Sequence, residues 1–279
     1  MKTLKYLSLI LIVFFASCSS DDSQSVTPDE LDGLKLVQEM QNDKHIIELY
    51  TTDGTLQQGY NAVSLRIKEK ASGNYITNAD ADWVPLMHMT SMQHSCPYSE
   101  ITKTPGKKTL YNGYIVFQMA QNEMENWTLQ VSYTINGSEY QVNEIISVPA
   151  SPKKRVTSFV GTDGSRYLIA LIEPSAPRIA VNDITAGVFK MESMMKYSVV
   201  NNYSIKTDPR MPGMGNHGSP NNTDLVQAAD GFYHGKLSLT MSGYWKINLQ
   251  LLNPQNEVLK GEPVTETTPG SSIFFEIEF

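Results

Sequence analysis

Two stretches of this chain decide its fold: Tyr111–Ala120 reads YNGYIVFQMA, and Tyr233–Ser242 reads YHGKLSLTMS. Both follow the pattern Tyr-x-Gly-x5-Met with a small residue after the methionine. Each is followed by an alternating segment that begins with tryptophan, at Trp127 and at Trp245, and the first copy has four more residues between its methionine and its tryptophan. Landmarks that recur in the same order indicate an internal duplication with copies of about 120 residues.

A methionine and histidine motif recurs upstream of each stretch. It reads Met89-x2-Met92-x-His94-x2-Pro97 in the first copy and Met211-x2-Met214-x2-His217-x2-Pro220 in the second. From each proline to the next tyrosine of the duplicated stretch the chain advances 14 residues in the first copy and 13 in the second. The two motifs therefore align, so that Met89 corresponds to Met211.

Short segments of alternating apolar and polar residues, separated by turn-forming residues, fill both copies. They lie at 45–50, 62–68, 127–133 and 141–148 in the first copy, and at 166–172, 245–249 and 272–279 in the second. The one helix signal is at 29–37. This pattern predicts an all-β fold made of two tandem immunoglobulin-like antiparallel β-sandwiches. We expect them at 35–150 and 151–279, each folding by itself, with Pro149–Arg155 as the linker.

The amino terminus has the layout of a secretory signal. Lys2 and Lys5 precede an apolar run from Leu7 to Ala16, which is too short to span a bilayer comfortably. The run ends in Phe15-Ala16-Ser17-Cys18, which resembles the lipobox of bacterial lipoproteins. The resemblance implies a signal peptide at 1–17, a lipid on Cys18 and a tether at 18–34 whose Ser-Ser-Asp-Asp start is similar to Bacteroidota lipoproteins. It places the protein in the cell envelope, membrane-anchored through Cys18, at the outer membrane on its periplasmic or surface face; the alternative is an ordinary cleaved signal with a chance cysteine.

Composition and motifs exclude several classes of function. Without Lys2 and Lys5, 20 of the 22 basic residues remain against 29 acidic ones, a net charge of −9. A chain this acidic, without a basic patch, is not expected to bind nucleic acid. Neither His-Glu-x-x-His nor Gly-x-Ser-x-Gly occurs, and we expect no enzyme.

The second copy of the methionine and histidine motif lies in the stretch MPGMGNHGSP, from Met211 to Pro220. Its Gly-x-Gly-x-x-Gly pattern is not a dinucleotide site, because the turn-forming SPNNTD follows where a helix would have to begin. Neutral thioethers favour Cu(I), and imidazole binds both copper states. We therefore expect a copper site, made by Met211, Met214 and His217 with Met241 or His234 as a fourth donor.

The first copy offers a comparable set of donors. They are His88, Met89, Met92, His94 and Cys96, with Met119 as the residue equivalent to Met241. Once Cys18 carries a lipid, Cys96 is the one remaining thiol, so no disulfide within the chain can form. Core packing is the alternative for these side chains, above all for Met119 and Met241 on alternating strands and for Cys96. Trp127 and Trp245 are expected in the two cores, and Met191, Met194 and Met195 at core or edge positions.

The second copy, from Gly187 to Leu252, resembles the YtkA-like domain of bacterial envelope proteins. The resemblance is carried by MPGMGNHG, by Gly231-Phe-Tyr-His-Gly-Lys-Leu and by Thr240-Met-Ser-Gly-Tyr-Trp245. It implies an immunoglobulin-like sandwich with a methionine and histidine loop, and through the related FixH-type proteins a link to copper. The first copy departs from the pattern, because Asn112 replaces His234 and the segment 121–126 lengthens the turn before Trp127.

Three functions remain open from the sequence. The first is an envelope lipoprotein that binds Cu(I) for buffering, resistance or handover to a copper-handling envelope protein. The second is a metal-free module that binds a partner in an envelope transport or assembly system. The third is a surface lipoprotein that binds glycans. Copper titration separates the first from the second.

Overall fold

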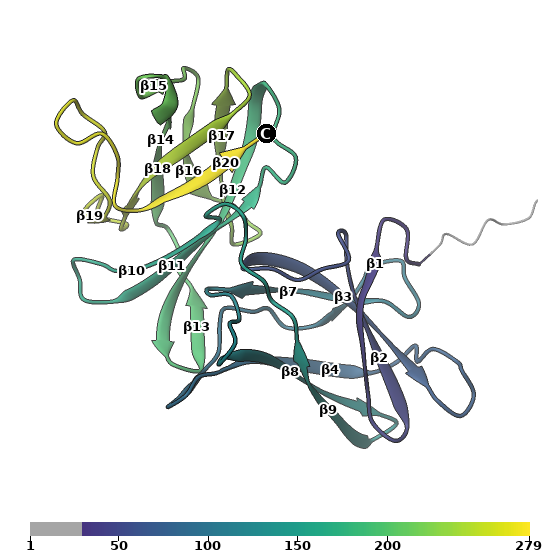
Figure 1. Ribbon diagram of the computed structural model, residues 1–279. Helices are drawn as coiled ribbons and strands as arrows, with labels where there is room; N and C mark the ends of the chain where they lie inside the picture. The colour runs from purple at the N-terminus through teal and green to yellow at the C-terminus, as the bar shows by residue number, and fades with distance from the viewer. Residues whose placement is uncertain (1–29) are drawn as a thin grey trace, which may run out of the picture.

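The computed structural model describes residues 30–279, which form two β-sandwiches in tandem (Figure 1). The predicted signal peptide and Cys18 lie outside the described residues. All strand pairs are antiparallel, and the described residues contain no α-helix, only the 3₁₀ turn η1 (Pro212–Met214). Nothing helical between residues 30 and 279 is both long and apolar enough to cross a membrane. The predicted all-β fold of two immunoglobulin-like sandwiches is confirmed.

The first sandwich consists of two separate sheets. One has the order β1-β2-β3-β7-β6 and the other the order β5-β4-β8-β9. The bounds are β1 Lys35–Gln41, β2 His45–Thr51, β3 Gly59–Glu69, β4 Asp80–His88, β5 Gln93–His94, β6 Thr102–Lys103, β7 Tyr111–Phe117, β8 Asn126–Ile135 and β9 Ser138–Ile146. The helix signal at 29–37 was wrong, because Lys35 and its successors pair with β2 along most of β1.

The second sandwich repeats this topology and adds the strands β13 and β19. Its strands β10-β11-β12-β17-β16 follow the order of the first sheet, and β15-β14-β18-β20 that of the second. Strand β16 also pairs with β14 and so joins the two sheets along one side. The bounds are β10 Val156–Val160, β11 Arg166–Glu173, β12 Ala180–Ser193, β13 Lys196–Val199, β14 Ser204–Met211, β15 His217–Gly218, β16 Thr223–Gln227, β17 Tyr233–Leu239, β18 Tyr244–Leu252, β19 Val258–Lys260 and β20 Phe274–Glu278.

Each sandwich has its own core. Trp83 and Trp127 are fully buried in the first, and Trp245 in the second, so the predicted positions of Trp127 and Trp245 are confirmed. The two sandwiches also share an asparagine that the alignment of the two sequence copies did not include. The side chain of Asn61 bonds the backbone of Gln57 and Gly59, and Asn182 bonds the backbone four and two residues before it in the same way.

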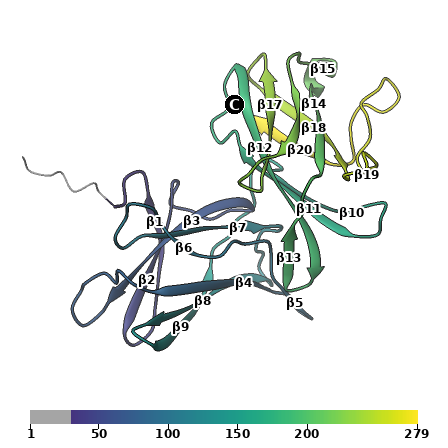
Figure 2. The same cartoon turned by 180° about the vertical axis from the view of Figure 1, so that it is seen from behind.

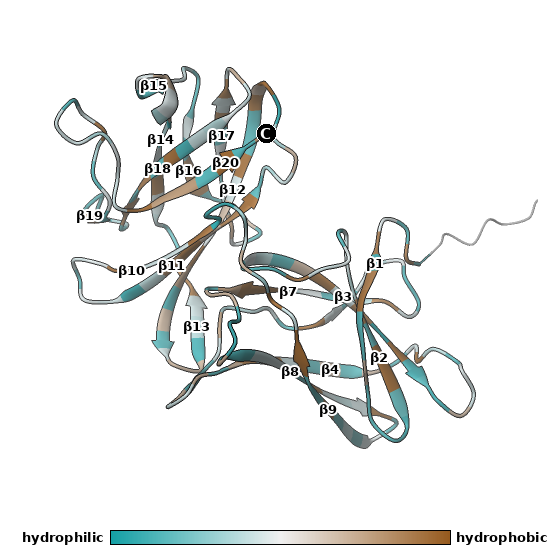
Figure 3. Ribbon diagram, viewed as in Figure 1, coloured by the Kyte–Doolittle hydropathy of each residue, from teal (hydrophilic) through white to brown (hydrophobic). Residues whose placement is uncertain are grey.

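The two sandwiches also share an apolar interface. Val116 of β7 packs against Val156, Leu168 and Phe189 of the second sandwich. Figure 3 shows hydrophobic stretches on β7 and β11, which meet there. The linker is fixed to both sides, since the Gln58 N–H donates to its Pro149 carbonyl and the Glu276 N–H to its Lys154 carbonyl. Separating the sandwiches would expose this face to water.

Candidate metal centre

The tyrosine and the glycine of the shared Tyr-x-Gly pattern have structural roles in both copies. The Tyr111 hydroxyl accepts a hydrogen bond from the Ala79 N–H at 2.8 Å, and the Tyr233 hydroxyl donates to the Val200 carbonyl at 2.8 Å. A Cβ at Gly113 would lie 2.7 Å from the Trp83 ring, and one at Gly235 2.7 Å from a backbone oxygen. Tyrosine and glycine are therefore explained by folding alone.

The methionine that closes each pattern is held by the tryptophan that follows. The Trp127 indole N–H donates to the Met119 carbonyl at 3.0 Å, and the Trp245 N–H donates to the Met241 carbonyl at 2.9 Å. Both methionine side chains are partly buried against the core of their own sandwich. Packing accounts for both thioethers.

The three ligands expected in the hairpin from β14 through η1 to β15 differ in their exposure to water. Met211 is 6% exposed and belongs to the core, whereas Met214 is 58% exposed and His217 is exposed. The turn is tight because Gly215 and Asn216 both have positive φ, at 64° and 59°. The tip therefore presents one thioether and one imidazole to water, and Met211 faces inward.

His234 lies too far from this tip to complete a site there. Strand pairing places His234 opposite Val226, and Val226 opposite Ser204, seven residues before Met211 on β14. At roughly 3.3 Å per residue the separation along the strand is about 23 Å. The His234 Nε2 lies 2.9 Å from an oxygen of Asp230 instead. This removes His234 from the ligand set expected for the loop.

Strand register also corrects the alignment of the two copies. Met87 lies opposite Trp127 and opposite His94. In the second copy Met211 lies opposite His217, and the β14–β18 register, continued by one residue, places it opposite Trp245. The fully buried Met87 is therefore the counterpart of Met211, and the alignment of Met89 with Met211 was wrong by two residues.

Three of the expected ligands in the first copy are engaged elsewhere. Both ring nitrogens of His88 have partners, the Thr128 hydroxyl at 2.9 Å and the Gln93 amide nitrogen at 2.8 Å. Met89 is partly buried against the core. Cys96 is 1% exposed, and burial raises the pKa of its thiol well above the usual value. A thiol kept protonated in an apolar core is a poor metal ligand.

His94 is arranged differently from these residues. It is 8% exposed, and its Nδ1 lies 2.8 Å from the Ser95 carbonyl oxygen. The Gln118 amide nitrogen lies 2.9 Å from the same Nδ1, so these contacts alone do not assign the tautomer. No described residue bonds Nε2. The Gln118 amide nitrogen donates to the same Ser95 carbonyl at 3.1 Å, and Gln118 Oε1 is buried without a donor.

A cavity of about 260 Å³ lies between the sandwiches next to His94. Its lining residues are His94, Gln118, Ser158, Phe159, Val160, Arg166, Tyr167, Leu168, Met191, Met194 and Tyr197. The two methionines come from the β12–β13 hairpin, whose tip is tied to the first sandwich because the Ser95 N–H donates to the Met194 carbonyl at 2.9 Å. The sequence prediction missed both as ligands, although Met191-x2-Met194 repeats the Met-x2-Met spacing of the two expected sites.

Four exposed methionines lie at the end of the first sandwich that carries His94. β4 ends at His88 opposite Asn126, where β8 begins, so the turns that carry Met92 and Met124 lie at one end of the first sandwich. The β12–β13 hairpin brings Met194 and Met195 to the same end (Figures 1 and 2). We call Met92, Met124, Met194 and Met195 the methionine end. They are four of the five methionines exposed in residues 30–279, and Met214 is the fifth.

Harder metals have no comparable site. Within the described part of the chain, no group of three or more histidine, cysteine, aspartate or glutamate side chains could hold a metal ion.

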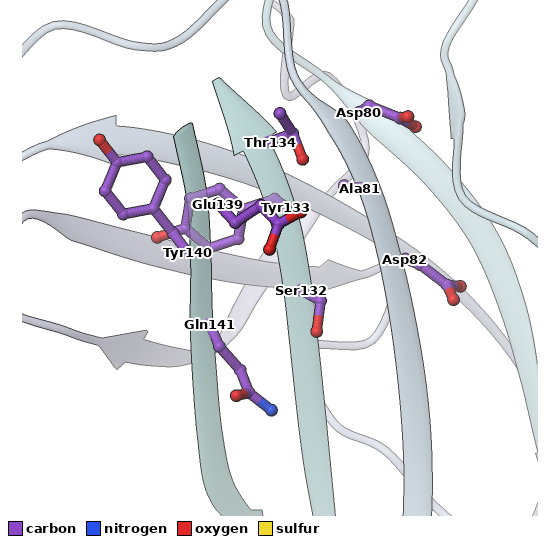
Figure 4. A pocket seen from close by; sticks show the side chains of 9 residues that line it. All are labelled: Asp80, Ala81, Asp82, Ser132, Tyr133, Thr134, Glu139, Tyr140 and Gln141. Atoms are coloured by element: carbon purple, nitrogen blue, oxygen red, sulfur yellow. The ribbon is translucent and has the colours of Figure 1, made fainter. Parts of the chain in front are cut away.

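A second pocket, of about 560 Å³, lies on β4, β8 and β9 of the first sandwich (Figure 4). Its lining is Asp80, Ala81, Asp82, Ser132, Tyr133, Thr134, Glu139, Tyr140 and Gln141, with three carboxylates and no lysine or arginine.

Comparison with known proteins adds little to this picture. No family model and no curated protein sequence matches the chain. Among solved structures it is similar to a chimeric titin Z1Z2-Z1Z2 tandem functionalised with a GRGDS peptide from fibronectin. The two share 14% sequence identity at a TM-score of 0.18, over 80% of this chain and 93% of that one. The fold assignment accordingly rests on the strand pairing of this chain.

Proposed function

We propose that this chain is a cell-envelope lipoprotein that binds Cu(I) at its methionine end and passes the ion to a copper-handling partner. The lipid on Cys18 anchors it to the outer membrane, and the two sandwiches are a scaffold without catalytic activity. Replacing Cys18 with alanine abolishes incorporation of a labelled fatty acid in cells; unchanged labelling would refute the anchor.

The proposal is carried by four exposed methionines, Met92, Met124, Met194 and Met195, at the end of the molecule that also carries His94. A methionine exposed to water buries little apolar surface, so core packing does not account for four of them at one end. Thioether sulfur is a soft, neutral donor that binds Cu(I) and has little affinity for Mg²⁺ or Ca²⁺. Exposed thioethers also suit exchange, because an incoming ligand can reach the ion.

The test is a titration of the mature chain with Cu(I) under anaerobic conditions, in competition with a chromophoric chelator. We expect a dissociation constant in the sub-micromolar range for Cu(I), which corresponds to more than about 8 kcal/mol. Parallel titrations with Mg²⁺ and Ca²⁺ are expected to give no binding. A chain that leaves all Cu(I) with the chelator is not a copper protein.

The acidic pocket in Figure 4 favours the alternative, a metal-free module that binds a partner. Carboxylates, hydroxyls and an amide from three adjacent strands would suit a polar or cationic ligand, whether a protein segment or a glycan. The copper titration separates the two candidates, because this pocket contains no sulfur donor. Failure of copper binding leaves the interaction module as the better candidate.

A further inference from the structure

The cavity between the sandwiches brings together side chains that are 97 or more residues apart in sequence, His94 from the first sandwich with Met191 and Met194 from the second. We infer that these three residues are the ligands of one Cu(I) ion, held where the two sandwiches meet. The inference rests on the copper-binding function proposed above and names the ligands. It also makes the site a property of the whole chain, because neither sandwich contains all three.

His94 has the arrangement that a metal-binding histidine requires. Its Nδ1 lies 2.8 Å from the Ser95 carbonyl oxygen and 2.9 Å from the Gln118 amide nitrogen, which fixes the ring orientation, and no residue between 30 and 279 bonds its Nε2. Trp127 further holds the ring by an edge contact, with centroids 5.7 Å apart. His217 at the other hairpin has no such bond to a carbonyl among the described residues. An imidazole already oriented loses little conformational entropy when it binds an ion.

The surroundings of His94 favour a soft ion over a hydrated one. Phe159, Val160 and Leu168 make much of the lining apolar, so an ion must give up its water shell to enter. Cu(I) with thioether ligands tolerates this loss, whereas Mg²⁺ does not.

Charge at the cavity does not oppose a monovalent ion strongly. Arg166 is the one cationic side chain in the lining, and it is exposed, so water and salt screen its charge. All three proposed ligands are neutral, so the bound ion keeps a single positive charge. Cys96 adds no thiolate, because it is buried in the core of the first sandwich.

Ligands from both sandwiches make copper a link between them. Met194 lies at the tip of the β12–β13 hairpin, and its carbonyl accepts a hydrogen bond from the Ser95 N–H of the first sandwich. A metal bond from each side adds to this contact and to the apolar interface. We therefore expect Cu(I) to slow amide hydrogen exchange in residues 191–197 and 94–96 together.

The experiment compares sulfur-deleting variants of the full mature chain in the chelator competition. Met191→Leu and Met194→Leu remove one sulfur each at nearly constant volume, and His94→Gln removes the imidazole. Met214→Leu is the matched control, since Met214 is exposed on the second sandwich, lies outside the methionine end and does not line the cavity. Each ligand variant is expected to weaken Cu(I) binding by at least about tenfold, and the control by less than about twofold.

The outcomes separate this inference from the function on which it rests. If the parent binds Cu(I) and the three ligand variants bind as tightly as Met214→Leu, copper lies elsewhere and the inference is overturned, while the proposed function stands. If the parent itself does not bind Cu(I), both fail. Circular dichroism melting of each variant identifies a loss that comes from unfolding, and the Met-to-Leu variants remain interpretable if His94→Gln is unstable.

Discussion

The β4–β5 and β14–β15 hairpins occupy the same place in the two sandwiches but present different chemistry. In both, a buried methionine lies opposite a histidine, Met87 opposite His94 and Met211 opposite His217. His94 is 8% exposed beneath the β12–β13 hairpin of the other sandwich, whereas His217 is exposed at a free tip. The duplication thus explains the fold of both hairpins, and the contact between domains explains why His94 lines a cavity between the sandwiches.

The largest expected effects test whether Met87 and Met211 are true counterparts. Both side chains are buried in a core, so Met87→Ala and Met211→Ala should each lower the free energy of unfolding by about 2–5 kcal/mol. Urea unfolding followed by tryptophan fluorescence measures this. Met92→Ala, at a 49% exposed position, is the control and should change the value by less than about 0.5 kcal/mol. A larger loss from Met89→Ala than from Met87→Ala would contradict the register.

A second pair tests the glycine of the Tyr-x-Gly pattern. A Cβ at Gly113 would meet Trp83 and Ser99, and one at Gly235 would meet the Thr223 carbonyl, all at 2.7 Å. Either change to alanine forces a packed group to move, at a cost of about 1–3 kcal/mol. Gly213→Ala is the control, because nothing lies within 4 Å of a Cβ there. Equal stability of the Gly113→Ala and Gly213→Ala variants would show that the close approach is not a constraint.

Much of the fold could be predicted because the repeated residues have local backbone roles. The side chains of Tyr111 and Trp127 each form a hydrogen bond with a nearby backbone group, and Gly113 leaves room for close packing. Their counterparts in the second copy do the same, so the pattern is recognisable in the sequence. The alignment of the first hairpin failed for a local reason. Seven residues separate Met87 from its partner His94 but six separate Met211 from His217, and the Met-x2-Met spacing common to both motifs hid that difference.

The candidate site could be predicted only in part. The sequence pointed to His94, and its Met-x2-Met repeat at Met191 was visible, but nothing local indicates that these residues meet. Their meeting depends on how two sandwiches pack, through Val116 and Phe189, which is a property of surfaces and not of spacing. Burial also removed two other expected ligands, Met211 and Cys96, because apolar neighbours enclose both side chains.

The smallest expected effect concerns the free hairpin tip. His217 is exposed and has no side-chain hydrogen bond within residues 30–279, and Met214 is 58% exposed, so neither contributes much to folding. His217→Ala and Met214→Ala should each change the free energy of unfolding by less than about 0.5 kcal/mol. His94→Ala should cost about 1–3 kcal/mol, because it removes a buried hydrogen bond to the Ser95 carbonyl and a ring contact with Trp127. Parallel urea unfolding of the three variants measures the contrast. A loss at His217 as large as that at His94 would mean that the second hairpin also packs against a surface, and that its tip is not free to exchange ligands with water.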